Sequence, residues 1–183
     1  MRRTASLLFL CSMLAAATVN AGETFKISST DVQDNQSLKP PQVFKGFGCD
    51  GGNRSPQMQW SGAPAGTKSF AVTMYDPDAP TGSGWWHWIV YNLPASVNGL
   101  GADAGQPGKL PLEAKHGRND YGRFDFGGAC PPPGDKPHRY ILTVHALRVE
   151  QLDVPNDASA ALIGYMLNAN RLGSATLTAT YGR

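Results

Sequence analysis

Alternating hydrophobic and polar residues predict a chain built mainly from β-strands. The longest such pattern spans residues 138–149, where Tyr140, Leu142, Val144 and Ala146 would share one face of a strand. Further strands are predicted over residues 24–28, 69–75, 86–93 and 176–181. Gly, Pro, Asn and Asp fill the segments between these strands, as is typical of turns.

One α-helix is predicted between Asp157 and Gly173. Asp157 can cap its N-terminus, and Gly173 can end it in the left-handed conformation. The apolar residues that recur at helical spacing are Ala161, Leu162, Tyr165, Met166 and Ala169. No repeat or shift of composition divides the chain, so residues 22–183 are predicted to form a single domain.

Three tryptophans and a histidine stand together at the start of a predicted strand. Strict alternation would place Trp86 and Trp88 on one face, with Trp85 and His87 on the other. We expect two of the three tryptophans to be buried in the core. His87 beside Trp85 would then place a polar group on an aromatic surface.

The first 21 residues predict export. Arg2 and Arg3 form a basic start, an apolar run follows, and Ala21 ends a pattern of small residues at which a signal peptidase can cut. The apolar run has about 13 residues, against the roughly 20 that a membrane-spanning helix needs. We therefore predict a cleaved signal peptide over residues 1–21 and not a transmembrane anchor, with residues 15–17 as an alternative cleavage site.

The charge of the chain excludes one class of partner. The formal net charge is +2, and the first 21 residues carry it, so residues 22–183 hold 14 basic and 14 acidic side chains. A neutral domain is a poor candidate for sequence-independent nucleic-acid binding, which depends on clustered Lys and Arg. The hydrophobic content of 41% also excludes a disordered chain.

Two cysteines, Cys49 and Cys130, remain after removal of the signal. In an oxidising compartment they favour one disulfide, and the alternative is two free buried thiols. Without a C-x-x-C pair they do not predict a zinc site.

Three short segments carry candidate chemistry. Asp76 and Asp78 stand on a turn stiffened by two prolines, His87 begins one strand, and His138 begins another after a Pro-rich loop that includes Pro131. Each segment alone is also compatible with an acidic surface turn, a core position or a solvated histidine.

Taken together, these segments resemble the phosphatidylethanolamine-binding protein family. The resemblance rests on residues 76–80 (DPDAP), 85–87 (WWH) and 127–140, and extends from residue 47 to the C-terminal helix. The Trp-rich segment and the two cysteines resemble its secreted bacterial branch. The resemblance implies two antiparallel sheets packed together with peripheral helices, and a periplasmic or secreted location.

The resemblance also implies a small anion-binding pocket at one end of the large sheet. The residues that match its lining are Asp76, Trp85, His87, Pro131, His138 and Tyr140. Tyr181 is a candidate for a further pocket tyrosine near the C-terminus. Phe126 stands where the family commonly has Tyr, and Ala129 where it commonly has Pro.

The chemistry of such residues suits an anion. Imidazole N–H groups can donate to phosphate or carboxylate oxygens, and a carboxylate beside an imidazole favours its charged form. We therefore expect Asp76 to orient and charge His87 or His138, leaving N–H groups aimed at the ligand. His145 is expected to be a packed core residue and His116 to be solvated.

The function expected first is a non-enzymatic binding or modulator protein with a small anionic or phosphorylated ligand and no cofactor. A metal-dependent enzyme is the alternative, with Asp76, Asp78, His87 and His138 as a two-His, carboxylate site. A second alternative is a protein–protein modulator, such as a kinase or protease inhibitor. The protein partner and the oligomeric state stay open.

Overall fold

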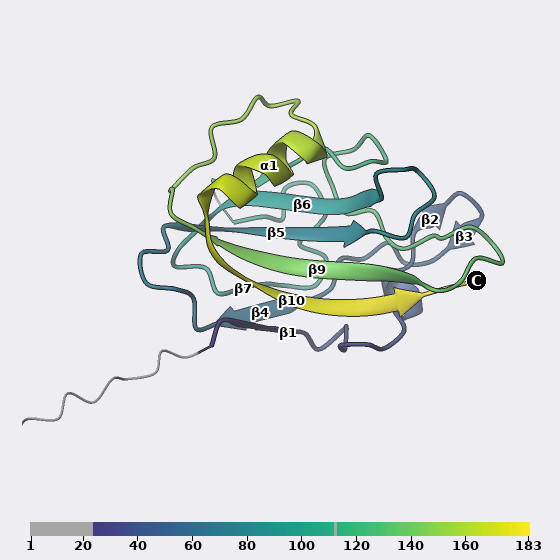
Figure 1. The fold of residues 1–183 in the computed structure, drawn as a ribbon. Coiled ribbons are helices and arrows are strands. Elements are labelled where there is room, and N and C mark those ends of the chain that lie inside the picture. The colour runs from purple at the N-terminus through teal and green to yellow at the C-terminus, as the bar shows by residue number, and fades with distance from the viewer. Residues whose placement is uncertain (1–23, 112) are drawn as a thin grey trace, which may run out of the picture.

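A five-stranded antiparallel sheet forms the centre of the fold (Figure 1). The computed structural model describes residues 24–111 and 113–183, so the predicted signal peptide lies outside the described residues. The strands, in spatial order, are β10 (Arg171–Tyr181), β9 (His138–Leu147), β5 (Ser69–Asp76), β6 (Trp85–Pro94) and β8 (Lys115–His116). Four of these five strands coincide with predicted segments, although β9 ends at Leu147, two residues before the predicted end.

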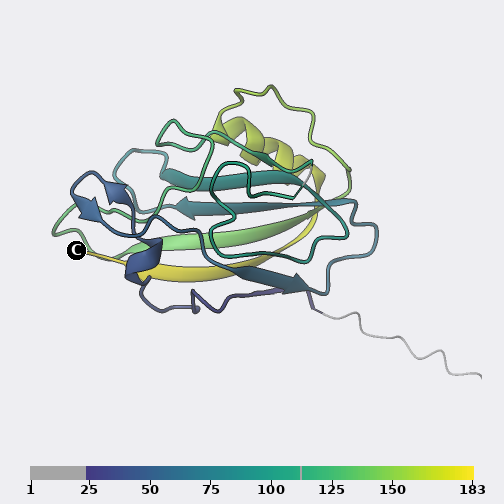
Figure 2. The same cartoon turned by 180° about the vertical axis from the view of Figure 1, so that it is seen from behind.

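A smaller antiparallel sheet covers one face of the large sheet (Figure 2). Its strands are β1 (Lys26–Ser28), β4 (Met58–Ser61) and β7 (Gly99–Leu100). Met58 and Trp60 from β4 pack into the main core with side chains of the large sheet. The predicted face of β9 belongs to this core, because Tyr140, Leu142, Val144 and Ala146 are all buried there.

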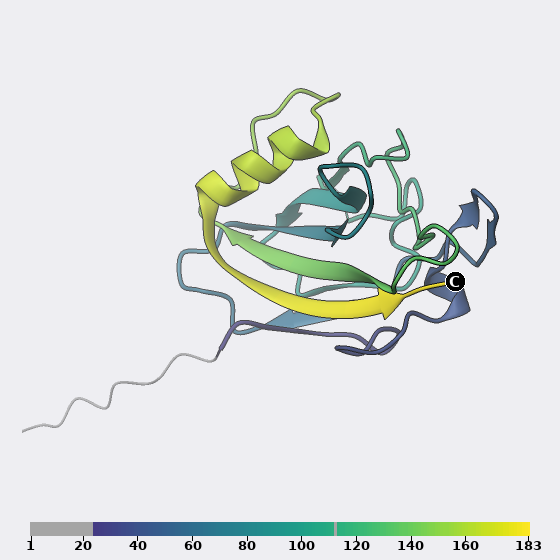
Figure 3. The ribbon, with the colours of Figure 1, turned by 45° about the vertical axis from the view of Figure 1, so that its right-hand side comes forward.

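Helix α1 (Ala160–Asn170) covers the opposite face of the large sheet (Figure 3). Ile163 and Leu167 of the helix pack against Ala71 and Ile89 of the sheet in a second core. The expected fold class, mainly β with two sheets and a helix near the C-terminus, is confirmed.

The ends of the helix differ from the prediction. Ser159, and not Asp157, is the N-cap, and its hydroxyl accepts a hydrogen bond from the Leu162 N–H. Arg171 already has extended backbone angles, so the chain runs from the helix straight into β10 and needs no left-handed glycine. Gly173 lies within β10, where a Cβ would approach Pro64 to 2.8 Å.

The buried face of the helix also differs. Leu162 and Tyr165 are exposed, whereas Ala160, Ile163 and Leu167 are buried. The helix is apolar on most of its circumference, so its sequence alone does not select a face. The contacts with the sheet make that selection.

A β-bulge corrects the predicted arrangement of the tryptophans. Met74 pairs with Trp88 and Tyr75 pairs with Trp86, so His87 is an extra residue in β6. Trp88 therefore enters the core between the sheets, while Trp86 packs on the helix side. The prediction that Trp86 and Trp88 share a face was wrong, because a bulge shifts the alternation by one residue.

The chain direction brings distant segments to one end of the large sheet. β5 ends there at Asp76, and β6 and β9 begin there at Trp85 and His138. The hairpin of β2 (Lys45–Gly46) and β3 (Cys49–Asp50) and the short helix η1 (Pro40–Gln42) lie at the same end, near the C-terminus (Figure 1).

Candidate ligand-binding site

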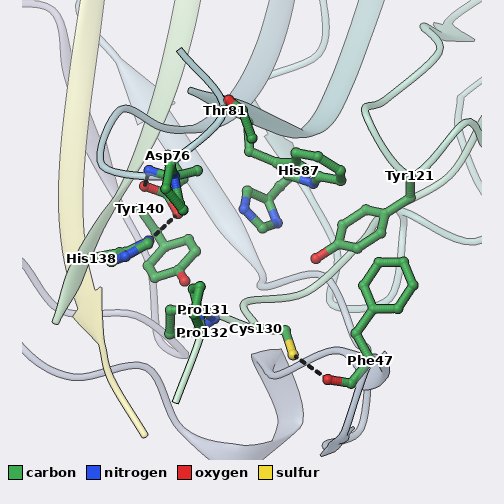
Figure 4. Close-up of a pocket in the computed structure, with 13 residues that line it drawn as sticks. Phe47, Asp76, Thr81, His87, Tyr121, Cys130, Pro131, Pro132, His138 and Tyr140 are labelled. Carbon is green, nitrogen blue, oxygen red and sulfur yellow. Dashed lines mark hydrogen bonds and ion pairs between the residues drawn. The ribbon is translucent and has the colours of Figure 1, made fainter. Parts of the chain in front are cut away.

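A cavity of about 220 Å³ opens at this end of the sheet (Figure 4). All six residues expected from the sequence line it: Asp76, Trp85, His87, Pro131, His138 and Tyr140. Their role in binding a ligand stays a prediction. The other lining residues are Phe47, Ala79, Pro80, Thr81, Tyr121, Cys130 and Pro132.

Asp76 and His138 form a buried pair that we call the carboxylate side of the cavity. His138 Nδ1 donates to Asp76 Oδ2 at 2.8 Å. The other carboxylate oxygen accepts the backbone N–H groups of Asp78 and Ala79, at 2.8 and 3.1 Å. Asp76 therefore orients His138, and its second oxygen holds the Pro-rich turn.

Asp78 fastens this turn to the start of β9. The guanidinium of Arg139 donates two hydrogen bonds to its carboxylate, from Nε at 2.9 Å and Nη2 at 2.7 Å, and the Arg139 backbone N–H donates a third at 2.9 Å. The hydrogen bonds from Arg139 lower the pKa of Asp78 from 3.8 to about 2. Asp78 is thus a structural residue of the turn and does not line the cavity.

His87 has different partners from His138. Its Nδ1 lies 2.9 Å from the carbonyl oxygen of Gly127 and 3.1 Å from that of Gly128. Burial lowers the pKa of His87 from 6.5 to about 4, so the ring is neutral at pH 7. Of the two histidines that Asp76 was expected to orient, it therefore orients His138, and the carbonyls of Gly127 and Gly128 hold His87.

Tyr121 lies beside His87 and was missed by the sequence analysis. Its hydroxyl donates to the Gly128 carbonyl at 2.9 Å, and its ring lies 5.7 Å from that of His87. A Cβ at Gly127 would clash with this ring, so the close approach requires glycine. Residues 117–128 show no alternation that could have placed Tyr121 in the site.

Phe44, Phe47 and Tyr121 form a group of aromatic rings that, with His87, we call the aromatic side of the cavity. Phe44 stacks on Tyr121 with ring centroids 4.2 Å apart, and Phe47 lies 5.8 Å from Tyr121. Phe47 is 73% exposed at the tip of the β2–β3 hairpin, so it forms the rim of the cavity.

A disulfide holds this hairpin against the Pro-rich loop. Cys49 and Cys130 are bonded, with Cα atoms 6.0 Å apart, which confirms the predicted pairing and excludes two free thiols. Arg183 reinforces the junction by donating to the carbonyls of Pro131, Gly48 and Phe47 at 2.7, 2.9 and 3.2 Å.

Tyr140 and Trp85 supply polar atoms inside the cavity. Within the described part of the chain, Tyr140 Oη, Trp85 Nε1 and His87 Nε2 are buried and have no hydrogen-bond partner. Burial raises the pKa of Tyr140 above its ordinary value, so its hydroxyl keeps its proton. Tyr181, proposed as a further pocket tyrosine, pairs with His138 in the β9–β10 ladder and packs against the main core, outside the lining of the cavity.

The two remaining histidines lie away from the cavity. His145 is buried and shares a hydrogen bond of 3.1 Å with Thr73, as expected of a core histidine. His116 is not solvated as expected. It lies in the short strand β8, accepts a hydrogen bond from Trp88 Nε1 at 3.3 Å, and burial lowers its pKa.

The geometry does not favour the metal-dependent alternative. Across residues 24–111 and 113–183, no three His, Cys, Asp or Glu side chains gather in a way that could hold a metal ion.

Among the described residues, no helix has the length and apolar character needed to cross a membrane.

Two packed antiparallel sheets with a histidine-lined pocket at one end define a class of binding proteins. The sequence matches the family model described as phosphatidylethanolamine-binding protein over residues 28–182, and the chain therefore belongs to this family. It is 53% identical to the protein YbcL of Escherichia coli, over 95% of this chain and 97% of YbcL. It is also 48% identical to E. coli YbhB, over 85% of this chain and 99% of YbhB.

Solved structures agree with this membership. The crystal structure of E. coli YbcL, described as a new member of the mammalian PEBP family, superposes with a TM-score of 0.85 at 55% identity, covering 87% of this chain and 98% of YbcL. A phosphatidylethanolamine-binding protein homologue from Chlamydia trachomatis superposes with a TM-score of 0.71 at 26% identity, covering 87% of this chain and 97% of the homologue.

Proposed function

We propose that the protein is a non-enzymatic binding protein whose cavity takes a small anion with the chemistry of a phosphate group. The carrying observation is the set of buried polar atoms in the cavity that lack a protein partner. Buried polar groups are normally hydrogen-bonded, so a ligand or water completes them. Tyr140 and Trp85 each offer a hydrogen-bond donor, which an oxyanion requires.

The position of Asp76 is compatible with an anion. Both of its oxygens are occupied, one by His138 and the other by the backbone N–H groups of the turn. A ligand therefore meets the hydroxyl of Tyr140 and the ring of His138 instead of a bare carboxylate. The cavity volume of about 220 Å³ suits an oxyanion with a small substituent.

Calorimetric titration with inorganic phosphate tests this proposal. We expect binding by the native protein, and about tenfold weaker binding by Tyr140→Phe, which removes one donor with little change of volume. Asp76→Asn should weaken binding by a similar factor, because His138 loses the carboxylate that orients it. Asp157→Asn, at an exposed position, is the matched control. Absence of binding by the native protein, or equal affinity in all variants, would overturn the proposal.

We propose a periplasmic or secreted location. The predicted signal peptide over residues 1–21 supports it, as does the disulfide, since such bonds persist in oxidising compartments. The intact mass of exported protein should correspond to a chain that begins at Gly22. A cytosolic chain that retains residues 1–21 would contradict this location.

A further inference from the structure

The two ring nitrogens of His87 have fixed and opposite roles. Its Nδ1 lies within hydrogen-bond distance of two carbonyl oxygens, those of Gly127 and Gly128. Carbonyl oxygens only accept hydrogen bonds, so Nδ1 must carry the proton. Gly127 and Gly128 thereby select the tautomer of the ring.

The second ring nitrogen, Nε2, carries a lone pair and no hydrogen. His87 is 2% exposed, and burial lowers its pKa to about 4, so Nε2 takes up no proton near neutral pH. The titratable groups around it are Asp76, His138, Tyr121 and Tyr140. The negative charge of Asp76 favours protonation of His87, but burial outweighs it.

Nothing in the described protein donates to this lone pair. His87 Nε2 is buried and unpartnered, while the His87 ring lines the cavity between the rings of Tyr121 and Tyr140 (Figure 4). An anion without a hydrogen would leave it unsatisfied and place an oxygen against a lone pair. A ligand that completes the cavity must therefore supply a hydrogen-bond donor at this point.

We infer that the cavity selects a phosphate that carries a proton, with the P–OH donating to His87 Nε2 and another phosphate oxygen accepting from Tyr140. This inference rests on the proposed function and narrows its ligand class. Inorganic phosphate keeps a proton throughout the neutral range, and a phosphate monoester keeps one up to its second pKa of about 6. Sulfate and phosphate diesters carry none at these pH values.

Calorimetric titrations at about pH 6 with inorganic phosphate and sulfate separate the two proposals. We expect phosphate to bind roughly 10- to 100-fold more tightly than sulfate, because sulfate leaves a buried acceptor unsatisfied. Equal affinity for the two ions would overturn the proton selection and leave the anion site intact. Failure of both ions to bind would overturn the proposed function, and this inference with it.

Two further ligands distinguish the possible sources of the phosphate. Binding of both inorganic phosphate and methyl phosphate would indicate a monoester terminus, whereas inorganic phosphate alone would indicate the free ion. Dimethyl phosphate represents the diester of a lipid head group, and we expect it to bind as weakly as sulfate. Dimethyl phosphate binding as tightly as methyl phosphate would overturn the inference.

The variant His87→Gln tests the residue. Its amide can present either an N–H or a C=O to the ligand, so the preference for phosphate over sulfate should fall to within a few-fold. His145→Gln, which replaces a buried neutral histidine outside the cavity, should keep the preference. An unchanged preference in His87→Gln would overturn the assignment.

Nuclear magnetic resonance gives an independent measurement on the native protein. Long-range ¹H–¹⁵N correlation at about pH 6 should show His87 with a protonated Nδ1 and an unprotonated Nε2. A proton on Nε2 would overturn the inference even if His87→Gln failed to fold.

Discussion

The two sides of the cavity use histidine in different ways. On the carboxylate side, Asp76 accepts the Nδ1 hydrogen of His138, and Nε2 lies 3.4 Å from Asp135. On the aromatic side, two backbone carbonyls accept the Nδ1 hydrogen of His87, and Nε2 has no partner within the described structure. Nδ1 carries a hydrogen in both rings, so the two histidines differ at Nε2, which lies near Asp135 in His138 and is left for a ligand in His87.

The largest loss of stability should follow from removing the disulfide that holds the aromatic side of the cavity. The Cys49–Cys130 bond closes a loop across a sequence separation of 81 and fixes the hairpin that carries Phe47. Replacing both cysteines with serine should lower the free energy of unfolding by about 4 kcal/mol in the chain-entropy model, measured by urea denaturation. Native protein in reductant should show the same loss. A loss below about 1 kcal/mol would mean that the hairpin is held by its other contacts.

The second largest effect should be a loss of folding stability in acid, which acts through His87 on the aromatic side. Burial lowers the pKa of His87 from 6.5 to about 4, so between these values the unfolded chain binds a proton that the folded chain does not. The contribution of neutral His87 is therefore complete above pH 6.5 and declines as pH falls towards 4, by about 3 kcal/mol in total.

The slope of unfolding free energy against pH measures this effect. It should be shallower in His87→Gln than in the native protein over that pH window. His145→Gln should remove a comparable part of the slope, because burial also lowers the pKa of His145 to about 4. Equal slopes in the native protein and both variants would contradict the neutral state of these histidines.

The smallest effect concerns the turn on the carboxylate side. The pKa of Asp78 is lowered to about 2 by the hydrogen bonds from Arg139, so its stabilisation is complete above 3.8 and is lost as pH falls towards 2. The pair is partly exposed, and we therefore expect Asp78→Asn to cost only about 1 kcal/mol at neutral pH. Thermal unfolding should show a smaller difference from native protein near pH 2, where Asp78 is about half protonated, and no difference near pH 1. A difference of unchanged size near pH 1 would indicate a role of Asp78 beyond its charge.

The sequence predicts the strands well because their pattern is local. The β9 alternation assigns Tyr140 and Leu142 to the core, and both are buried. The predictions of the buried helix face and of the tryptophan arrangement were wrong for a common reason. The buried face of the helix depends on its contacts with the sheet, and the β-bulge at His87 depends on the pairing of β5 with β6, and no local pattern records either.

Part of the candidate site could likewise be predicted from the sequence, and part could not. Asp76, His87 and His138 stand at the ends of predicted strands, and the family resemblance assigned all three to one pocket, whose lining they share. Tyr121 comes from an irregular loop, and its position depends on the glycines that it contacts. Asp76 was recognised as a partner for one of the two histidines, but the carbonyls of Gly127 and Gly128 that hold the other could not be predicted, because backbone carbonyls carry no sequence signal.

The contacts of Arg183 bear on when this pocket can form during folding. Its guanidinium holds Gly48 and Phe47 across sequence separations of 135 and 136 residues. Contacts between such distant segments slow folding, since a long chain must close before they form. The rim of the cavity is therefore expected to assemble late, after the central strands have paired, so a nascent chain would acquire its sheet before it could retain a ligand.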